Sequence, residues 1–152
     1  MPRLDAARVT AWRDLQSITA RLERGIDENL MAEWQVPLGW FDVLAALARL
    51  GGSARPSELA DELRLVRSST SRRIDRLEEE GWVRRRPGAG RTDDHRAVVV
   101  ELTARGRTLW RAMNVTYRRA VQACFAGRLQ DDDVAELVRI LDLIADAPPI
   151  AI

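Results

Sequence analysis

The sequence predicts a mainly α-helical fold with one small β-hairpin, and three observations support this prediction. Apolar residues recur every three or four positions over most of the chain, which is the period of helices that bury one face. Two short central segments, 82–86 and 97–102, are β-branched or alternating in character, and a tip rich in glycine and aspartate joins them. The length of 152 residues is that of a single domain.

The composition excludes several functional classes. Hydrophobic residues make up 46% and charged residues 31% of the chain, as in a folded protein. No apolar run reaches the roughly 20 residues that span a bilayer, and the N-terminus lacks a signal-peptide core, so we expect a cytoplasmic protein. A single cysteine, Cys124, and a single histidine, His95, leave no zinc cluster and no catalytic triad. The sequence therefore predicts neither an enzyme nor a protein with a metal or other cofactor.

Positive charge is concentrated in the middle of the chain. The net charge is only +1, and all 24 basic residues are arginines. Residues 64–96 hold ten arginines and six acids, a local charge of +4, whereas the remainder carries −3. Such a basic segment is typical of a surface that binds a polyanion.

Two helices are expected in the N-terminal third. The first is long, about seven turns, and carries a largely apolar stripe. Its stripe consists of Val9, Trp12, Leu15, Gln16, Thr19, Leu22, Ile26 and Leu30. The second follows Pro37, runs over about 38–50, and ends at two consecutive glycines, Gly51 and Gly52.

Two shorter helices form the centre of the predicted fold. The first covers 56–63, with a small strand beginning at Ser53 or Arg55 before it. After a break at 64–66, the second covers about 67–80, and Gly81 ends it. Its buried face is expected to be Thr70, Ile74 and Leu77. A tight turn between two short helices, the second rich in Ser, Thr and Arg, indicates a helix-turn-helix. The β-hairpin that follows is then its wing.

Two C-terminal helices complete the chain. Thr103 is the expected N-cap of the first, and the second is expected to begin after the acidic run 131–133. The first carries Leu109, Met113, Tyr117, Ala120 and Cys124 on one side, and the second carries Val134, Leu137, Val138, Leu141 and Ile144.

The outer helices have apolar stripes that a winged helix alone cannot cover. A symmetry mate is the simplest partner for them, so we expect a homodimer. The chain is thus interpreted as one domain over 1–152, with a winged helix DNA-binding lobe at about 36–102 and dimerisation helices at about 5–34 and 104–146.

The order of elements and four strings resemble the MarR family of bacterial transcriptional regulators over about 8–146. LGWFDVLAAL (38–47) is similar to the family's second helix, and SELADELRL (57–65) to its first helix-turn-helix element. TSRRIDRLEEEGWVRR (70–85) resembles the recognition helix and the start of the wing, and DDHRAVVVELTARG (93–106) the second half of the wing. The resemblance implies a sequence-specific regulator, commonly a ligand-responsive repressor, that binds a palindromic operator as a homodimer.

The chain departs from the family pattern at three positions. Val66 stands where a capping serine is common before the recognition helix, so Ser68 is expected to help start that helix. His95 replaces an arginine that is common within the Asp-x-Arg motif of the wing. Cys124 lies far from the N-terminal cysteine of the oxidation-sensing members, so we do not expect peroxide sensing by that route.

The recognition helix supplies the first candidates for contacts with double-stranded DNA. Helical spacing places Arg67, Ser68, Ser71 and Arg72 on one face. We expect Ser68, Ser71 and Arg72 to contact base edges in the major groove. Arg67 and Arg73 are expected to contact phosphates.

The wing supplies the second set. Arg96 resembles the family residue that enters the minor groove, where a narrow A·T-rich groove concentrates negative potential. Asp94 lies two residues earlier, on the same side of the strand, and is expected to orient it. Arg91 at the tip is a further candidate. The alternative is that the hairpin is only a solvated charged loop.

Other arginines of this region have open roles. Arg76 is either a DNA contact or one half of a structural ion pair. Arg84, Arg85 and Arg86 alternate across a strand, so they cannot all face the same ligand.

The resemblance also implies a small aromatic or anionic effector between the dimerisation helices and the DNA-binding lobe. Trp12 and Trp40, with Trp110 or Tyr117, are candidates for the walls of such a pocket. The alternative is that these aromatic side chains belong to the core, which is the commoner role at helical spacing.

A urate-responsive branch of the family uses a tryptophan, an acid and two arginines. The corresponding candidates are Trp12, Asp61, Arg96 and Arg107.

A winged helix that mediates protein association without reading DNA is the competing interpretation. The Ser and Arg cluster argues against it, because protein interfaces favour apolar anchors. The residues do not distinguish a repressor from an activator.

Overall fold

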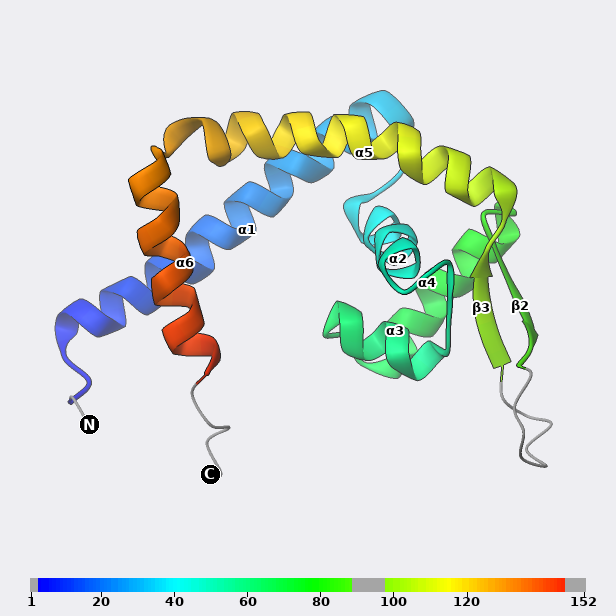
Figure 1. Cartoon of the computed structure of the whole chain (residues 1–152), viewed down its shortest axis with the longest axis horizontal. Helices are drawn as coiled ribbons and strands as arrows, with labels where there is room; N and C mark the ends of the chain where they lie inside the picture. Colours follow the sequence, from blue (N-terminus) through cyan, green and yellow to red (C-terminus); the bar gives the residue numbers. More distant parts are fainter. Residues whose placement is uncertain (1–2, 89–97, 147–152) are drawn as a thin grey trace.

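The computed structural model describes residues 3–88 and 98–146, and these form a mainly helical protein with one small sheet (Figure 1). Its elements are α1 (Ala6–Trp34), α2 (Leu38–Arg49), β1 (Ser53–Ala54), α3 (Pro56–Leu63), α4 (Arg67–Glu79), β2 (Val83–Pro87), β3 (Val98–Leu102), α5 (Ala104–Cys124), the 3-10 helix η1 (Ala126–Arg128) and α6 (Asp131–Ala145). The predicted fold class, a winged helix-turn-helix between N- and C-terminal helices, is confirmed.

The three strands form one antiparallel sheet in the order β1-β3-β2. In its register Val83 pairs with Leu102 and Pro87 with Val98, so β2 and β3 are the two sides of the wing. The short β1 pairs Ser53 with Glu101 and continues the sheet on the other side of β3. The predicted small strand before α3 is therefore real, and it ties the wing to the helix-turn-helix.

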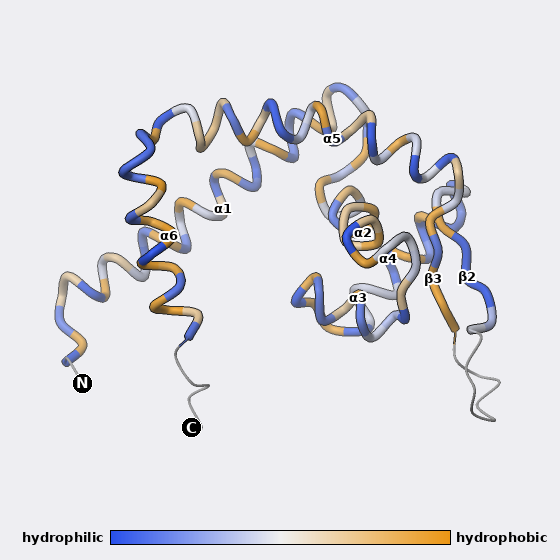
Figure 2. Tube along the Cα trace, viewed as in Figure 1, coloured by the Kyte–Doolittle hydropathy of each residue, from blue (hydrophilic) through white to orange (hydrophobic). Residues whose placement is uncertain are grey.

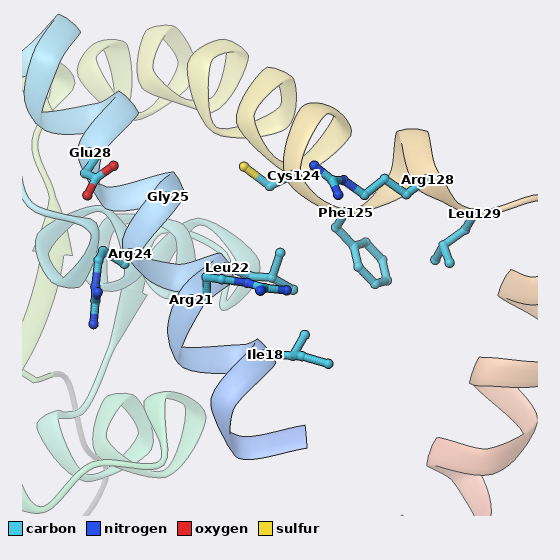
Figure 3. A pocket seen from close by; sticks show the side chains of 10 residues that line it. All are labelled: Ile18, Arg21, Leu22, Arg24, Gly25, Glu28, Cys124, Phe125, Arg128 and Leu129. Atoms are coloured by element: carbon cyan, nitrogen blue, oxygen red, sulfur yellow. The ribbon is translucent and has the colours of Figure 1, made fainter. Parts of the chain in front are cut away.

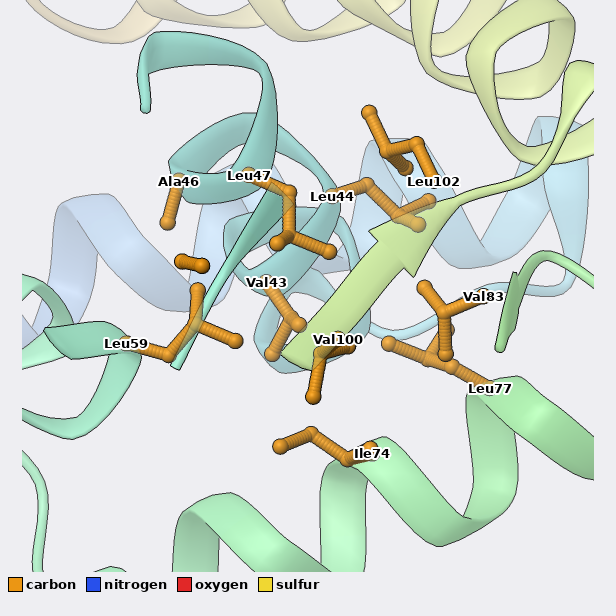
Figure 4. Packing of buried hydrophobic residues seen from close by; sticks show 11 residues of the cluster. Val43, Leu44, Ala46, Leu47, Leu59, Ile74, Leu77, Val83, Val100 and Leu102 are labelled. Carbon is orange, nitrogen blue, oxygen red and sulfur yellow. The ribbon is translucent and has the colours of Figure 1, made fainter. Parts of the chain in front are cut away.

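The helix-turn-helix lobe has its own apolar core (Figure 4). Side chains from α2, α3, α4 and the sheet meet there, and the largest are fully buried. They include Leu44, Leu47, Leu59, Ile74, Leu77, Val83 and Val100. Because every element of the lobe contributes to this cluster, α3, α4 and the wing are held in one arrangement.

A second apolar cluster joins the lobe to the long helices. It contains Ile26 and Leu30 of α1, Phe41 of α2 and Met113 of α5. Trp34 adds a polar link, because its Nε1 donates to Thr116 Oγ1 of α5 at 2.9 Å. The C-terminal end of α1 is therefore packed between α2 and α5.

The rest of α1 has a different environment. Ile26 and Leu30 are its only buried residues in the described chain, although the apolar stripe begins at Val9. Trp12, Leu15 and Ile18 are exposed. The N-terminal half of α1 therefore presents its stripe to solvent in this single chain.

The helix α5 spans the molecule from the wing to the end near α6 (Figure 1). Thr103 is its N-cap, with Oγ1 accepting from Gly106 N at 3.0 Å, as predicted. Gly106 lies against the base of the wing, and a Cβ atom there would stand 1.9 Å from the carbonyl oxygen of Trp82. Thr103 N also donates to that oxygen, at 3.1 Å. The start of α5 is thus fixed closely to the start of β2.

The last helix, α6, begins earlier than predicted. It starts at Asp131, with Gln130 as N-cap, so Asp131, Asp132 and Asp133 form its first turn instead of preceding it. Asp133 Oδ2 accepts from Gln130 N at 2.9 Å, and negative charge at this end matches the helix dipole. The predicted boundary was wrong because these acids stabilise the first turn from within. In the described chain, α6 has no buried residue, and hydrophobic and hydrophilic segments alternate along it (Figure 2).

Candidate nucleic-acid interface

The recognition helix α4 has one buried and one exposed face. Thr70, Ile74 and Leu77 are buried in the lobe, as predicted. Arg67, Ser68, Ser71 and Arg72 are all exposed, together with Asp75 and Arg76 further along the helix. The four residues that the sequence placed on one face are thus brought together on the solvent side of α4.

The start of α4 differs from the prediction. The helix begins at Arg67, and Val66 is its N-cap residue in extended conformation, without a side-chain hydrogen bond to the first turn. Ser68 lies within the first turn and is exposed, so it does not occupy the capping position. Val66 O accepts the first intrahelical hydrogen bond from Thr70 N at 3.1 Å and a second hydrogen bond from Thr70 Oγ1 at 3.2 Å, but neither bond supplies an acceptor for the free N–H groups of the first turn.

Arg73 occupies a different place from the other arginines of α4. Its side chain is half-buried, and Nη1 donates to Gly39 O at the start of α2, at 3.0 Å. Gly39 permits this approach, since a Cβ atom there would stand 2.9 Å from the guanidinium carbon. Arg73 therefore connects α4 to α2, and the phosphate contact expected from the sequence remains a prediction.

The carboxyl group of Asp42 lies close to this connection. Burial raises its pKa above the ordinary value, Arg73 and Arg49 oppose this shift, and Glu23 adds to it. The α4–α2 connection thus has a partly buried acid beside it.

Arg76 forms an ion pair with Glu79, with Nη1 at 3.1 Å from Oε2. Both side chains are well exposed, and such pairs contribute little to stability. The ion pair expected as one alternative for Arg76 is present, and its partner is Glu79 and not Asp75 or Glu78, which are nearer in sequence. It leaves the guanidinium accessible for the other role.

The three arginines of β2 are divided between the two faces of the strand. Arg85 turns toward α4, where Glu78 accepts from its backbone N at 2.8 Å and from its Nη1 at 2.9 Å. Asp75 Oδ1 accepts from Arg85 Nη2 at 2.6 Å. Three hydrogen bonds therefore fix the wing to the recognition helix.

Arg84 and Arg86 lie on the opposite face and share one carboxylate. Glu101 Oε2 accepts from Arg84 Nε at 3.2 Å and from Arg86 Nε at 2.7 Å. The hydrogen bond from Arg84 lowers the pKa of Glu101, and Arg86 lowers it further. The sequence indicated the alternation, but it did not identify these acidic partners.

The tip of the wing lies outside the described residues. The predictions for Arg91, Asp94 and Arg96 fall there, as does His95.

The predicted effector residues lie in separate environments. Trp40 and Tyr117 are partly buried and pack against the second apolar cluster, where Tyr117 stacks on Phe41 with ring centroids 4.7 Å apart. Trp40 meets Trp82 edge to face at 6.2 Å. These contacts favour the alternative interpretation, that both aromatic side chains pack against the core, and their role in an effector pocket remains a prediction. Trp110 also packs against both clusters.

The remaining predicted effector residues are exposed. Trp12 lies on the exposed N-terminal half of α1, and Asp61 lies on α3. Arg107 lies on α5, and its guanidinium is close to Gly52, since a Cβ atom there would stand 2.9 Å from Nη2. Of four main hollows among the described residues, one is lined by Trp40, and none of the four is lined by Trp12, Asp61, Arg107 or Tyr117.

A hollow of about 560 Å³ lies where α1, α2, the α3 end and α4 meet. Glu23 and Asp27 of α1, Asp42 of α2 and Arg73 of α4 contribute charged groups to its wall. Asp27 also has a structural role, because its Oδ1 accepts a hydrogen bond from Leu38 N, at the start of α2, at 2.7 Å. Sequence reasoning predicted only a phosphate contact for Arg73 and missed its grouping with Glu23, Asp27 and Asp42, because the three helices that bring these residues together are far apart in the chain.

A larger hollow of about 730 Å³ lies between α1 and the α5–η1 corner (Figure 3). Ile18, Leu22, Phe125 and Leu129 give it an apolar surface. Arg21, Arg24, Glu28 and Arg128 add charge, and Cys124 also lines it.

Two other kinds of site have no candidate in the described part of the chain. Among residues 3–88 and 98–146, no three His, Cys, Asp or Glu side chains are grouped so that they could hold a metal ion. No helix in the described ranges is long and apolar enough to cross a membrane.

The chain is similar to known proteins over most of its length. A family model described as the MarR family matches residues 34–92, which include α2, β1, α3, α4 and β2 but not β3, the second strand of the wing. The HTH-type transcriptional regulator PecS of Dickeya dadantii (strain 3937) is 32% identical over 110 residues, 71% of this chain. The matched region spans 64% of the length of PecS.

Two solved structures are similar along nearly their whole length. Sco3205, a MarR family transcriptional regulator from Streptomyces coelicolor in complex with DNA, has a TM-score of 0.84 and 27% identity over 97% of this chain and 96% of its own. A mutant MarR from E. coli complexed with operator DNA has a TM-score of 0.79 and 25% identity over 94% of this chain and 99% of its own. These relatives are regulators, which agrees with the expectation that the chain is not an enzyme. With the winged helix, the exposed α4 face and these similarities, the chain belongs to the MarR family of transcriptional regulators.

Proposed function

We propose that this protein is a cytoplasmic, sequence-specific regulator that binds double-stranded DNA as a homodimer and responds to a small ligand as a repressor. The observation that carries the proposal is the exposed face of α4, where Arg67, Ser68, Ser71 and Arg72 lie together beside a wing that Arg85 fixes to the same helix. A helix of this kind fits the major groove, and its serine and arginine side chains match base edges and phosphates.

The contacts divide by chemistry. Ser68, Ser71 and Arg72 read base edges from the groove, and Arg67 binds a phosphate. The wing adds Arg96 in the minor groove, oriented by Asp94, and Arg91 at its tip. Because the wing is bonded to α4, both elements engage the duplex in a fixed relation.

Homodimer formation is supported by the apolar residues that a single chain leaves uncovered. Trp12, Leu15 and Ile18 of α1 are exposed, and α6 exposes a stripe of its own. The exposed large apolar residues of α6 are Val134, Val138, Ile140, Leu141, Leu143 and Ile144. Burying such surfaces against a second copy is favourable at about 25 cal/mol for each Å² of apolar area.

Charge complementarity supports the same partner. The helix α6 holds five acids and one arginine, Arg139. The hollow between α1 and the α5–η1 corner has three arginines, Arg21, Arg24 and Arg128, against Glu28. The acidic helix α6 of one copy is therefore complementary to the basic hollow of the other copy, and both surfaces also carry apolar residues. Two recognition helices on a twofold axis then require a palindromic site.

Ligand response is supported by the hollow at the meeting point of α1, α2 and α4. A small molecule in this hollow would contact both α1 and Arg73 of the recognition helix α4. If it prefers a geometry in which the two α4 helices no longer match successive major grooves, it releases the DNA. This is the physical basis of the proposed ligand response, in which the repressor leaves its operator when the ligand binds.

In-vitro selection of bound duplexes with the purified protein tests the proposal. The expected result is a palindromic site whose half-sites are about one helical turn apart, with an affinity that falls steeply with salt. Sedimentation at the same concentrations should give a dimer. A protein that enriches no sequence and ignores duplex DNA in dilute salt would contradict the proposal and favour a protein-interaction module.

A further inference from the structure

Val66 is the most exposed large apolar side chain among the described residues of the winged helix lobe. Its relative exposure is 67%, compared with 40% for Leu50 and 41% for Val98. Single apolar residues on a surface are common and by themselves carry no meaning. The position of this one is unusual, because it directly precedes Arg67 and Ser68 at the N-terminal end of α4.

Local stability does not account for a valine here. Val66 is the N-cap residue, a position at which Ser, Thr, Asp or Asn stabilises a helix by about 1 kcal/mol over an apolar residue. Its side chain makes no capping hydrogen bond, and its exposure shows that it is not part of the lobe core. Val66 therefore supplies neither a capping hydrogen bond nor a buried apolar side chain.

The backbone holds this side chain in a defined place. Arg64 adopts the left-handed conformation with φ of 53°, and Leu65 N donates to Ala60 O at 3.0 Å. The carbonyl of Val66 accepts from both Thr70 N and Thr70 Oγ1. The two methyl groups are thus presented from a hydrogen-bonded turn and not from a loose loop.

We propose that Val66 is a specificity residue that contacts the C5-methyl group of a thymine in the major groove. This inference rests on the proposed DNA binding. Residues at the N-terminal end of a recognition helix reach base edges, and an apolar side chain there is complementary to the methyl group that distinguishes thymine. The contact excludes water from both surfaces, which compensates for the missing cap only when DNA is bound.

Uracil substitution tests the contact directly, since uracil differs from thymine only by that methyl group. Each thymine of one half-site in a selected duplex is replaced singly by uracil, and binding is titrated. With the unaltered protein, one replacement should weaken binding about fourfold, as expected for one buried methyl group. With Val66→Ala, that same replacement should have no effect.

Val66→Ser provides the matched control for folding. A serine restores the capping side chain, so the melting temperature should hold or rise while the sensitivity to uracil disappears. If every thymine-to-uracil replacement has the same effect on the unaltered protein and on both variants, the inference is wrong. If the unaltered protein enriches no duplex at all, the proposed function fails instead, which is a separate outcome.

Discussion

Glu78 of the recognition helix accepts two hydrogen bonds from Arg85 of the wing, one from the backbone N at 2.8 Å and one from Nη1 at 2.9 Å. With the further bond from Arg85 Nη2 to Asp75, α4 and β2 are joined through side chains as well as through the core. This joint determines how the groove-facing helix and the wing approach one duplex.

We expect Arg85→Gln to weaken DNA binding more than it weakens the fold. Each exposed ion pair contributes up to about 1 kcal/mol to stability, whereas a misplaced wing loses a groove contact worth about 1–3 kcal/mol of binding free energy. Melting temperature and gel-shift titration measure the two effects. Arg84→Gln is the control, because its partner Glu101 lies within the hairpin itself. Equal losses in both variants would show that the joint has no special role.

Arg96→Ala should lower specific affinity by about 1–3 kcal/mol, mostly at A·T pairs flanking the half-sites. The reason is the loss of a guanidinium from a narrow minor groove. Gel shifts on a selected site and on the same site with flanking G·C pairs measure it. Arg86→Ala is the comparison, since Arg86 is engaged by Glu101. An unchanged titration for Arg96→Ala would remove this residue from the interface.

Arg67 and Arg72 should respond differently to alanine substitution. For Arg67→Ala we expect a uniform loss across sequences and a salt slope that is smaller by about 0.9, as for one lost phosphate contact. For Arg72→Ala we expect relaxed specificity at one base pair and a cost of about 1–3 kcal/mol there. Titrations over a salt series, on selected and altered duplexes, separate the two roles. Identical behaviour of the two variants would mean that the assignment is wrong.

Leu141→Asp in α6 should separate the dimer without unfolding the lobe. Leu141 is exposed in the single chain, so an aspartate costs little there, whereas it would place an unpaired charge in the subunit contact. Sedimentation measures assembly, and circular dichroism measures helix content. Arg139→Gln on the same helix should stay dimeric, since Arg139 already pairs with Glu136. A dimeric Leu141→Asp protein would place the contact elsewhere.

Asp42→Asn should stabilise the protein more at neutral pH than in acid. Burial raises the pKa of Asp42 in the folded state above the ordinary value of 3.8, so the folded protein binds the proton more tightly than the unfolded chain. Stability from this group is therefore present in acid and lost as the pH rises from 3.8 through the folded pKa. Urea unfolding of both proteins between about pH 3 and pH 7 measures the difference. A stability difference that does not change with pH would contradict this prediction.

Local signals predicted most of the fold. The spacing of Thr70, Ile74 and Leu77 indicated the buried face of α4, and Gly81 indicated where α4 ends. Thr103 was correctly predicted as the N-cap of α5. Each of these features depends on neighbours within one or two helical turns. The start of α6 was misplaced, since a run of acids is compatible with both the cap and the first turn.

Long-range partners could not be predicted in this way. The side-chain bonds of Arg85 to α4 and of Arg73 to Gly39 depend on how elements pack, and an arginine-rich sequence offers many equivalent pairings. Aromatic residues were ambiguous for a related reason, because Trp40 and Tyr117 suit either a ligand pocket or a core. Packing of Trp40 against Trp82 and of Tyr117 against Phe41 favours the core.

Gly106 has a consequence for the spacing of the two half-sites in the proposed homodimer. Alanine at this position would collide with the Trp82 carbonyl and tilt α5 away from the wing. The helix has 21 residues and is therefore about 30 Å long, so a tilt of about 5° at one end moves the other by about 2–3 Å. In a twofold assembly that displacement is applied to both halves. In the proposed homodimer, the number of base pairs between the two half-sites is therefore expected to depend on the single hydrogen atom that Gly106 carries where every other amino acid has a carbon.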